Sequence, residues 1–241
     1  MFGSRIAYAV VMLVAALVAT IVVRRHQIGL ALTASERWTI VGSGFVGATF
    51  AAKLPFLIFG QASGPWWMTW LGDGKTILWG LAGGYVGVEV GKLMLDVRTR
   101  TGDTFVVGVA TAIGIGRLGC LFFGCCYGTP TDLPWGIRFE TAEDHGTLFR
   151  HPTQIYEAMF HLLFAMLARQ GISLGWIRGN WMPVYLISYC TYRFMTEFIR
   201  PEPRLFAGFT FYQLSAVLIA VGMLVVLTRR SQPMPKLPQT K

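Results

Sequence analysis

The sequence predicts an all-α integral membrane protein, a bundle of seven transmembrane helices with its N-terminus outside and its C-terminus in the cytoplasm. The composition predicts the membrane class, because 54% of the 241 residues are hydrophobic and only 14% are charged. A soluble domain carries about 25% charged residues. This composition excludes a disordered chain, a nucleic-acid-binding tail protein and an ordinary soluble enzyme.

Seven windows meet the requirement of roughly 20 mostly apolar residues for a spanning helix. They are Ile6–Val23, Trp38–Gly60, Thr76–Leu95, Thr104–Phe123, Thr153–Ala168, Trp181–Ile199 and Phe206–Thr228. The first window follows Arg5 as a signal peptide would, but its apolar run is too long and Arg24 follows it, so we interpret it as a retained helix. Residues 1–230 are therefore predicted to form one transmembrane domain, followed by a disordered cytoplasmic tail at 231–241.

Basic residues at the helix ends predict the orientation, because cytoplasmic loops carry the excess of Lys and Arg. If the N-terminus is outside, the cytoplasmic set is Arg24, Arg25, Arg37, Lys92, Arg98, Arg100, Arg169, Arg178, Arg229, Arg230, Lys236 and Lys241. The outer set is smaller: Arg5, Lys75, Arg138, Arg150, Arg200 and Arg204. This asymmetry predicts an outward-facing loop at 126–152, and we expect the functional site on that extracytoplasmic face. The net charge of +9 is explained first by loops facing anionic lipid and only then by an anionic substrate.

Arg117 lies inside a predicted helix, directly after a glycine-rich run. An Arg at the bilayer centre costs about 3 kcal/mol on insertion scales, so it needs a partner or a function. One interpretation is an Arg that extends to the outer headgroups or forms a structural ion pair. The other is a ligand site, because glycines allow a helix or ligand to approach the backbone closely.

A polar stripe runs along the sixth window. Tyr189, Arg193, Glu197 and Arg200 fall within one narrow sector of a helix, which cannot face acyl chains. Arg193 and Glu197 are spaced to pair with each other, which leaves Arg117 and Arg200 without an assigned acid. Surplus guanidinium groups near the outer leaflet suit a phosphate, and a phospholipid headgroup is the nearest one.

A second polar group opens the fifth window, where His151 precedes a helix that carries Gln154, Glu157 and His161 on one face. His151 is interpreted as either a loop residue or a site residue. Glu157 is interpreted either as a neutralising partner of an arginine or as a substrate contact.

Three segments resemble the prolipoprotein diacylglyceryl transferase family. The first combines Arg117-Leu118-Gly119, Tyr127-Gly128 and 131–136 (TDLPWG), the second is 151–157 (HPTQIYE), and the third is Tyr189 with 193–194 and 197–200. The order and spacing are similar to those of the family from about the second helix to the end of the chain.

The resemblance implies a seven-helix bacterial inner-membrane enzyme whose site opens to the outer leaflet. It would transfer the diacylglyceryl group of phosphatidylglycerol to the thiol of a prolipoprotein lipobox cysteine and release glycerol 1-phosphate, without a cofactor or metal. For catalysis the resemblance implies Arg193, Glu197 and Tyr189, to which we add His151 as a candidate. For binding phosphatidylglycerol it implies Arg117 and Gly128, to which we add Tyr127, Arg200, Gln154 and Glu157 as candidates.

Two departures from the family pattern concern activation of the acceptor thiol. Ala82 replaces a family histidine, and Cys120 and Cys125 replace an asparagine and a glutamate. Tyr127, His151 and Glu89 are, in that order, the candidates to deprotonate the thiol. Three rival functions follow: a sister transferase with another acceptor, a non-catalytic protein that binds or translocates lipid, and a thiol redox membrane protein.

Cys120, Cys125 and Cys126 lie near the outer end of the fourth window. An extracytoplasmic location permits a disulfide, which we rank first, before inert core residues and a catalytic thiol. Zinc ranks last, because Cys-x4-Cys-Cys is not a usual structural spacing.

Overall fold

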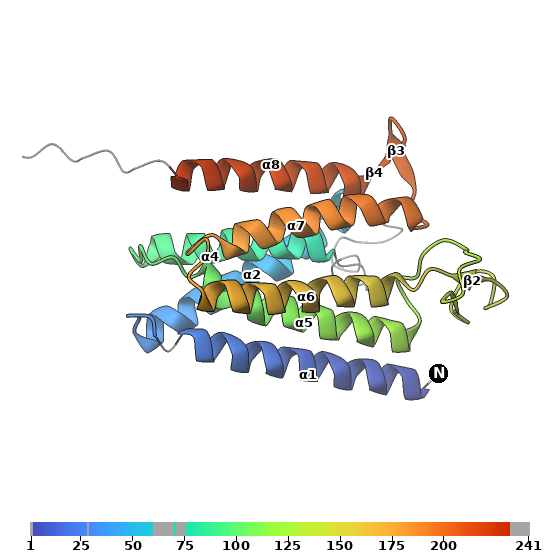
Figure 1. Ribbon diagram of the computed structural model, residues 1–241, viewed down its shortest axis with the longest axis horizontal. Coiled ribbons are helices and arrows are strands. Elements are labelled where there is room, and N and C mark those ends of the chain that lie inside the picture. The colour runs from blue at the N-terminus through green and yellow to red at the C-terminus, as the bar shows by residue number, and fades with distance from the viewer. Residues whose placement is uncertain (1, 28, 60–69, 71–75, 232–241) are drawn as a thin grey trace, which may run out of the picture.

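The computed structural model describes residues 2–27, 29–59, 70 and 76–231, which form seven long helices lying side by side (Figure 1). They are α1 (Phe2–Gln27), α2 (Ala34–Phe59), α4 (Ile77–Met94), α5 (Gly102–Phe123), α6 (Thr153–Ser173), α7 (Trp181–Thr196) and α8 (Phe211–Ser231). Each overlaps one of the predicted windows over most of its length. Four of them, α1, α2, α5 and α8, are long and apolar enough to cross a membrane. The prediction of a helical membrane protein is therefore confirmed, while the number of spans and the direction of the termini stay predictions.

Short strands, which the sequence analysis did not predict, lie in two of the connecting segments. β1 (Ile137–Arg138) pairs antiparallel with β2 (Phe149–Arg150), and β3 (Arg204–Phe206) pairs with β4 (Phe209–Thr210). The second pair delays the start of α8, which was predicted at Phe206, because the chain first turns at Gly208 with a φ of +78°. The sixth window also ends differently, since α7 tightens into a 3-10 turn, η1 (Glu197–Ile199).

The helices pack mainly as the pairs α2 with α4, α1 with α5, α5 with α6, and α7 with α8. Small residues allow the closest of these approaches: a Cβ added to Gly83 of α4 would lie 2.5 Å from the Gly47 carbonyl oxygen of α2. Such contacts between small residues are how helices associate in lipid. The apolar core is centred on α7, where Tyr185 and Leu186 are fully buried.

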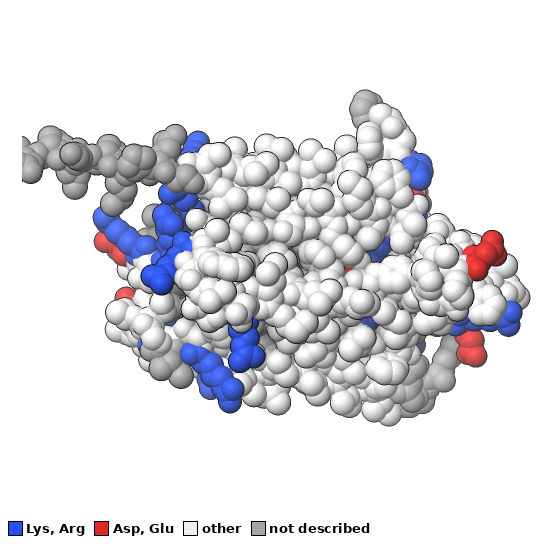
Figure 2. Space-filling model, viewed as in Figure 1, with Lys and Arg blue, Asp and Glu red and all other residues white. Residues whose placement is uncertain are grey.

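Charged side chains gather toward the two ends of the bundle on the face seen in Figure 2, with a largely uncharged band between them. The end of α5, the start of α6, the end of α7 and the start of α8 all lie at the same end of the bundle, on the right in Figure 1. The segments that carry the predicted site residues are therefore brought together, although up to about 90 positions separate them in the sequence.

Candidate functional site

Glu157 on α6 is the centre of a buried polar network at this end of the bundle. Its Oε1 accepts hydrogen bonds from Arg117 Nη2 of α5 at 2.8 Å and from the Tyr189 hydroxyl of α7 at 2.6 Å. Its Oε2 accepts one from Arg200 Nη2 at 2.9 Å. Glu157 has no exposed surface, so one carboxylate ties three segments together.

Arg193 and Glu197 form a second buried pair next to it, with 2.8 Å between Arg193 Nη2 and Glu197 Oε2. Thr210, at the end of β4, donates a hydrogen bond to Glu197 Oε1 at 2.9 Å. The Arg193 guanidinium also lies over the Tyr212 ring, 4.6 Å from its centre. We call the five residues of the two networks, Arg117, Glu157, Arg193, Glu197 and Arg200, the arginine–glutamate cluster.

The local sequence explains how these side chains reach one another. Gly114 lies one turn before Arg117, and a Cβ there would come within 2.8 Å of Leu162 on α6. Its absence lets α5 and α6 approach closely enough for Arg117 to reach Glu157. The polar stripe predicted on the sixth window is confirmed as inward-facing, since Tyr189, Arg193 and Glu197 are at most 5% exposed.

Glu157 also corrects one expectation. The sequence left Arg117 and Arg200 without an acid, but both bind Glu157. The reason is that the partner comes from another helix, 40 and 43 positions away, which spacing along one helix cannot reveal.

The cluster retains unsatisfied positive charge and unpaired donors. Its three guanidinium groups face two carboxylates, so one positive charge is uncompensated within the cluster. Arg117 Nε, Arg193 Nη1 and Arg200 Nε are buried and find no hydrogen-bond partner among the described residues. Buried donors without partners cost about 1–3 kcal/mol each, more for charged groups. The arrangement is thus suited to bind a monoanion rich in oxygen acceptors.

The loop between α5 and α6 is fixed directly against this cluster. The Gly128 amide donates to the His151 carbonyl at 2.8 Å, and the Thr129 amide donates to the Ile199 carbonyl at 2.9 Å. A Cβ on Gly128 would lie 2.7 Å from both His151 Cβ and the Ile199 oxygen, so only glycine fits. His151 is half-buried, and its Nδ1 lies 3.4 Å from the Tyr156 hydroxyl. Gly128 and His151, which come from two different motifs, therefore lie together.

An ion pair stabilises the same loop further out. Asp144 accepts hydrogen bonds from the Leu148 amide at 2.7 Å and from Arg150 Nη2 at 2.8 Å. These partners, the backbone amide first, lower the pKa of Asp144 to about 2. Tyr127 lies under the Arg150 guanidinium, which is 5.2 Å from the ring centre, and stacks on Phe139. Tyr127 thus belongs to the packing of the loop.

Three thiols converge beside Arg117. The Sγ atoms of Cys120, Cys125 and Cys126, which we call the thiol cluster, lie within 4.8 Å of one another. All four cysteines of the chain are free, so the disulfide ranked first from the sequence is not formed in this structure. Hydrogen bonds from Cys120 and Cys125, helped by Arg117 and Arg200, lower the pKa of the Cys126 thiol.

Gln154 contacts the backbone of the thiol cluster rather than the arginines. Its Nε2 donates to the Cys125 carbonyl at 2.6 Å, and the neighbouring Thr153 hydroxyl donates to the Cys126 carbonyl at 2.5 Å. The first residues of α6 therefore hold the backbone of the two cysteines in place.

Ala82, which replaces the family histidine, and Glu89, a candidate base, lie away from the thiol cluster. Ala82 packs against the apolar core, so it carries no chemistry. Glu89 pairs with Lys92 at 3.0 Å and with Arg230 at 3.2 Å. Because Arg230 is at the end of α8, this group lies at the end of the bundle opposite the arginine–glutamate cluster. Glu89 is therefore not placed to activate a thiol there.

Three polar residues, His161, Tyr185 and Thr210, join the site without having been assigned to it. His161 is fully buried one turn after Glu157, 3.8 Å from its Oε1, and its Nδ1 lies 2.7 Å from the Tyr185 hydroxyl. The signal for Tyr185 was its position four residues before Tyr189, on the same helical face. Thr210 could not be found from the sequence pattern, because it reaches Glu197 only through the pairing of β3 with β4.

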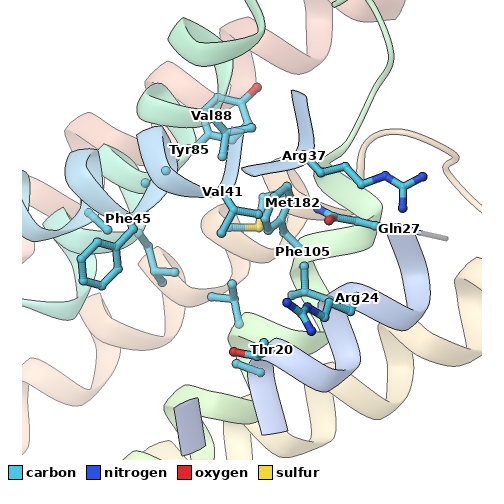
Figure 3. A pocket seen from close by; sticks show the side chains of 18 of the residues that line it. Thr20, Arg24, Gln27, Arg37, Val41, Phe45, Tyr85, Val88, Phe105 and Met182 are labelled. Carbon is cyan, nitrogen blue, oxygen red and sulfur yellow. The ribbon is translucent and has the colours of Figure 1, made fainter. Parts of the chain in front are cut away.

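A cavity of about 650 Å³ opens between α1, α2, α4 and α5, away from the arginine–glutamate cluster. Figure 3 shows its apolar wall and, at one side, the polar side chains of Arg24, Gln27 and Arg37. The residues at this side lie where α1 ends and α2 begins, at the end of the bundle that carries Glu89. The cavity is therefore separate from the polar network around Glu157.

Comparison with known proteins gives one family. Residues 4–229 match the family model described as prolipoprotein diacylglyceryl transferase. A phosphatidylglycerol–prolipoprotein diacylglyceryl transferase of Clostridium tetani is 34% identical over 167 residues, 67% of this chain and 67% of that protein. An enzyme of the same name from Cupriavidus pinatubonensis is 34% identical, over 61% of this chain and 58% of that protein. One from Vibrio vulnificus is 30% identical, over 77% of this chain and 71% of that protein. The chain thus spans about half to two thirds of the length of most of these relatives. No solved structure matches.

Proposed function

Because the chain belongs to the prolipoprotein diacylglyceryl transferase family, we propose that it transfers the diacylglyceryl group of phosphatidylglycerol to the thiol of a prolipoprotein cysteine. It is a helical membrane transferase whose relatives are named for these two substrates. The acceptor is the lipobox cysteine, and the second product is glycerol 1-phosphate. Residues 1–230 form the catalytic domain.

One observation carries this proposal: each of the three clustered arginines has a buried guanidinium nitrogen that finds no partner in the part of the chain that the structure describes. A phosphodiester bears one negative charge, which matches the single uncompensated charge of the arginine–glutamate cluster. Its oxygens would satisfy the free donors of Arg117, Arg193 and Arg200. Glu157 and Tyr189 hold Arg117 and Arg200 in position for this contact.

The same contacts favour the transfer step. The acceptor sulfur attacks the glycerol carbon that carries the phosphate, the carbon–oxygen bond breaks, and its electron pair leaves with glycerol phosphate. Negative charge therefore grows on the phosphate oxygens in the transition state. Fixed guanidinium groups in a site without water stabilise such a charge strongly. Arg117 supplies this stabilising positive charge together with Arg193, which Glu197 holds in position.

The acceptor must react as a thiolate, so its proton needs a destination. His151 lies in the loop that contacts the cluster, and its ring nitrogen is close to the Tyr156 hydroxyl. We assign the proton of the acceptor to His151, since Glu89 lies at the opposite end of the bundle. Gly128 keeps this loop against the end of η1.

The topology follows from the same arrangement. Seven helices span a bacterial inner membrane, with the N-terminus outside and the C-terminus in the cytoplasm. The basic ends of α1 and α8 support this orientation, because Arg24, Arg25, Arg229 and Arg230 lie at one end of the bundle. The arginine–glutamate cluster then opens to the outer leaflet, where the acceptor emerges.

A sister transferase with a different acceptor is the second candidate. It is favoured by the apolar Ala82 at the position of the family histidine and by the thiol cluster.

The purified protein in phosphatidylglycerol vesicles, mixed with a lipobox peptide that contains one cysteine, tests the proposal. Mass spectrometry is expected to show the peptide with one added diacylglyceryl group, and an equal amount of glycerol phosphate. Phosphatidylcholine vesicles are the matched lipid control and should give neither product. Release of glycerol phosphate without modified peptide would favour the sister transferase over the proposed function. If neither product forms, both candidate functions are refuted.

A further inference from the structure

The geometry of the thiol cluster is that of a metal site. Cys125 Sγ and Cys126 Sγ lie 3.8 Å apart, and no pair in the cluster is separated by more than 4.8 Å. Zinc–sulfur bonds of about 2.3 Å in a tetrahedron place the sulfurs roughly 3.8 Å apart. One pair thus has the required spacing, and the third sulfur needs to move by at most about 1 Å, which a rotation of its side chain supplies.

The backbone of the cluster is fixed in an unusual conformation. Cys126 has a φ of +64°, a left-handed value that non-glycine residues rarely adopt. Such strain persists only where the surroundings impose it, and it is concentrated at functional sites. Here Gln154 and Thr153 impose it by binding the carbonyls of Cys125 and Cys126. Their thiols thereby lie near that of Cys120, which is in the last turn of α5, about one turn after Arg117.

The chemistry of the three ligands selects the metal. Sulfur is a soft donor that binds zinc and monovalent copper in preference to magnesium or calcium. A divalent ion with three thiolates carries one negative charge, and Arg117 and Arg200 act on the cluster with positive charge. Among the described residues no histidine or carboxylate joins the group as a fourth ligand. Cys126 is exposed, so that fourth position is open to an incoming molecule.

We propose that Cys120, Cys125 and Cys126 bind one zinc ion whose open fourth position takes the acceptor thiol as a thiolate. Three protein ligands with an open position are typical of catalytic zinc, and a coordinated thiol loses its proton outright. The thiol proton leaves to His151 or to water, the metal-bound sulfur forms the new carbon–sulfur bond, and the phosphate leaves as described. The zinc ion thus activates the acceptor thiol, which the apolar side chain of Ala82 cannot do. The binding site stands independently of the proposed function, whereas the role in the transfer rests on it.

Metal binding by the full-length chain tests the site without any reaction. After incubation with zinc and gel filtration in detergent, elemental mass spectrometry is expected to find about one zinc per chain. Cys120→Ser, Cys125→Ser and Cys126→Ser should each lower the zinc affinity by more than the roughly 10–100-fold caused by losing an outer-shell partner. Cys190→Ser is the matched control, because that cysteine is buried on α7 outside the cluster, and it should bind zinc like the wild type.

Cobalt gives a second readout on the unaltered protein, so a variant that fails to fold does not decide the result. Cobalt bound in the same site should show thiolate-to-metal charge-transfer absorption, which added zinc abolishes. Folded wild-type protein that retains no zinc, or cobalt absorption without a thiolate band, would overturn the proposal.

The role in the transfer is tested by comparing zinc-loaded and chelator-treated protein in the vesicle assay with the lipobox peptide. Peptide modification should be lost on chelation and restored by added zinc. Undiminished modification by metal-free protein would overturn the role of zinc while leaving the proposed function intact. If the protein binds zinc but neither the zinc-loaded nor the chelator-treated form modifies the peptide, the metal site stands and the proposed function is refuted.

Discussion

Arg117 on α5 and Glu157 on α6 form an ion pair of 2.8 Å in which neither side chain is more than 9% exposed. The two residues are 40 positions apart and come from helices that pack closely at Gly114. Glu157 binds Arg200 at the same time, so it is the residue that converts three separate segments into one site. The properties of this pair lead to specific expectations for variants.

Glu157→Gln should destabilise the protein strongly. The substitution keeps the shape of the side chain but leaves the buried Arg117 and Arg200 without a carboxylate. Removing one partner of a buried pair costs about 3–5 kcal/mol. Thermal unfolding in detergent measures the loss as a lower transition temperature.

The matched control is Glu89→Gln, because Glu89 also pairs with two basic residues but its side chain is 38% exposed. Its effect should stay near the 0–1 kcal/mol of surface pairs. Equal effects of the two variants would show that Glu157 does not organise the site.

Gly128→Ala should reduce the transfer without disturbing the helices. The new Cβ would lie 2.7 Å from both His151 Cβ and the Ile199 oxygen, so the loop must move away from the cluster. Overpacking of this kind costs about 1–3 kcal/mol. Activity should fall at least tenfold in the vesicle assay, while the helical circular dichroism is retained. Gly222→Ala on α8, where a Cβ meets nothing within 4 Å, should behave like the wild type.

Asp144 should titrate far below an ordinary carboxyl group. The Leu148 amide and Arg150 favour its charged form, which lowers its pKa to about 2 from an ordinary value of about 3.9. A lowered pKa means that this group stabilises the fold fully above about pH 4, and that the contribution is lost as the pH falls through 2. Carbon-13 NMR of the labelled carboxyl group measures the midpoint.

Arg150→Ala should raise that midpoint, because the ion pair contributes to the shift. A midpoint near 3.9 in the unaltered protein would contradict the contacts that fix the loop between α5 and α6.

The helices could be predicted from the sequence because their apolar windows are long and nearly free of charge. The inward stripe on α7 was predictable from helical periodicity, since Tyr189 and Arg193 share one face of a single helix. The pairing of Arg117 with Glu157 could not be predicted, because it depends on which helices pack together. The start of α8 was wrong by five residues, because the turn at Gly208 forms a strand pair that apolar patterning does not reveal.

The cysteines show a further limit of sequence patterns. Their predicted extracytoplasmic location favoured a disulfide, but the left-handed conformation of Cys126 and the hydrogen bonds from α6 bring three free thiols together instead. Such an arrangement depends on the backbone after α5 and on a helix that begins 27 residues later. Neither is encoded in the local spacing.

The most direct test of the central claim compares Arg117→Ala with Arg230→Ala in phosphatidylglycerol vesicles with the cysteine peptide. Both arginines bind a glutamate, but Arg117 belongs to the arginine–glutamate cluster and Arg230 to the opposite end of the bundle. We expect equal amounts of glycerol phosphate and modified peptide from the wild type and from Arg230→Ala. In Arg117→Ala both products should fall by about 100-fold or more, the scale seen when a group that stabilises transition-state charge is removed. Full activity in Arg117→Ala would contradict the assignment of the phosphate to this cluster.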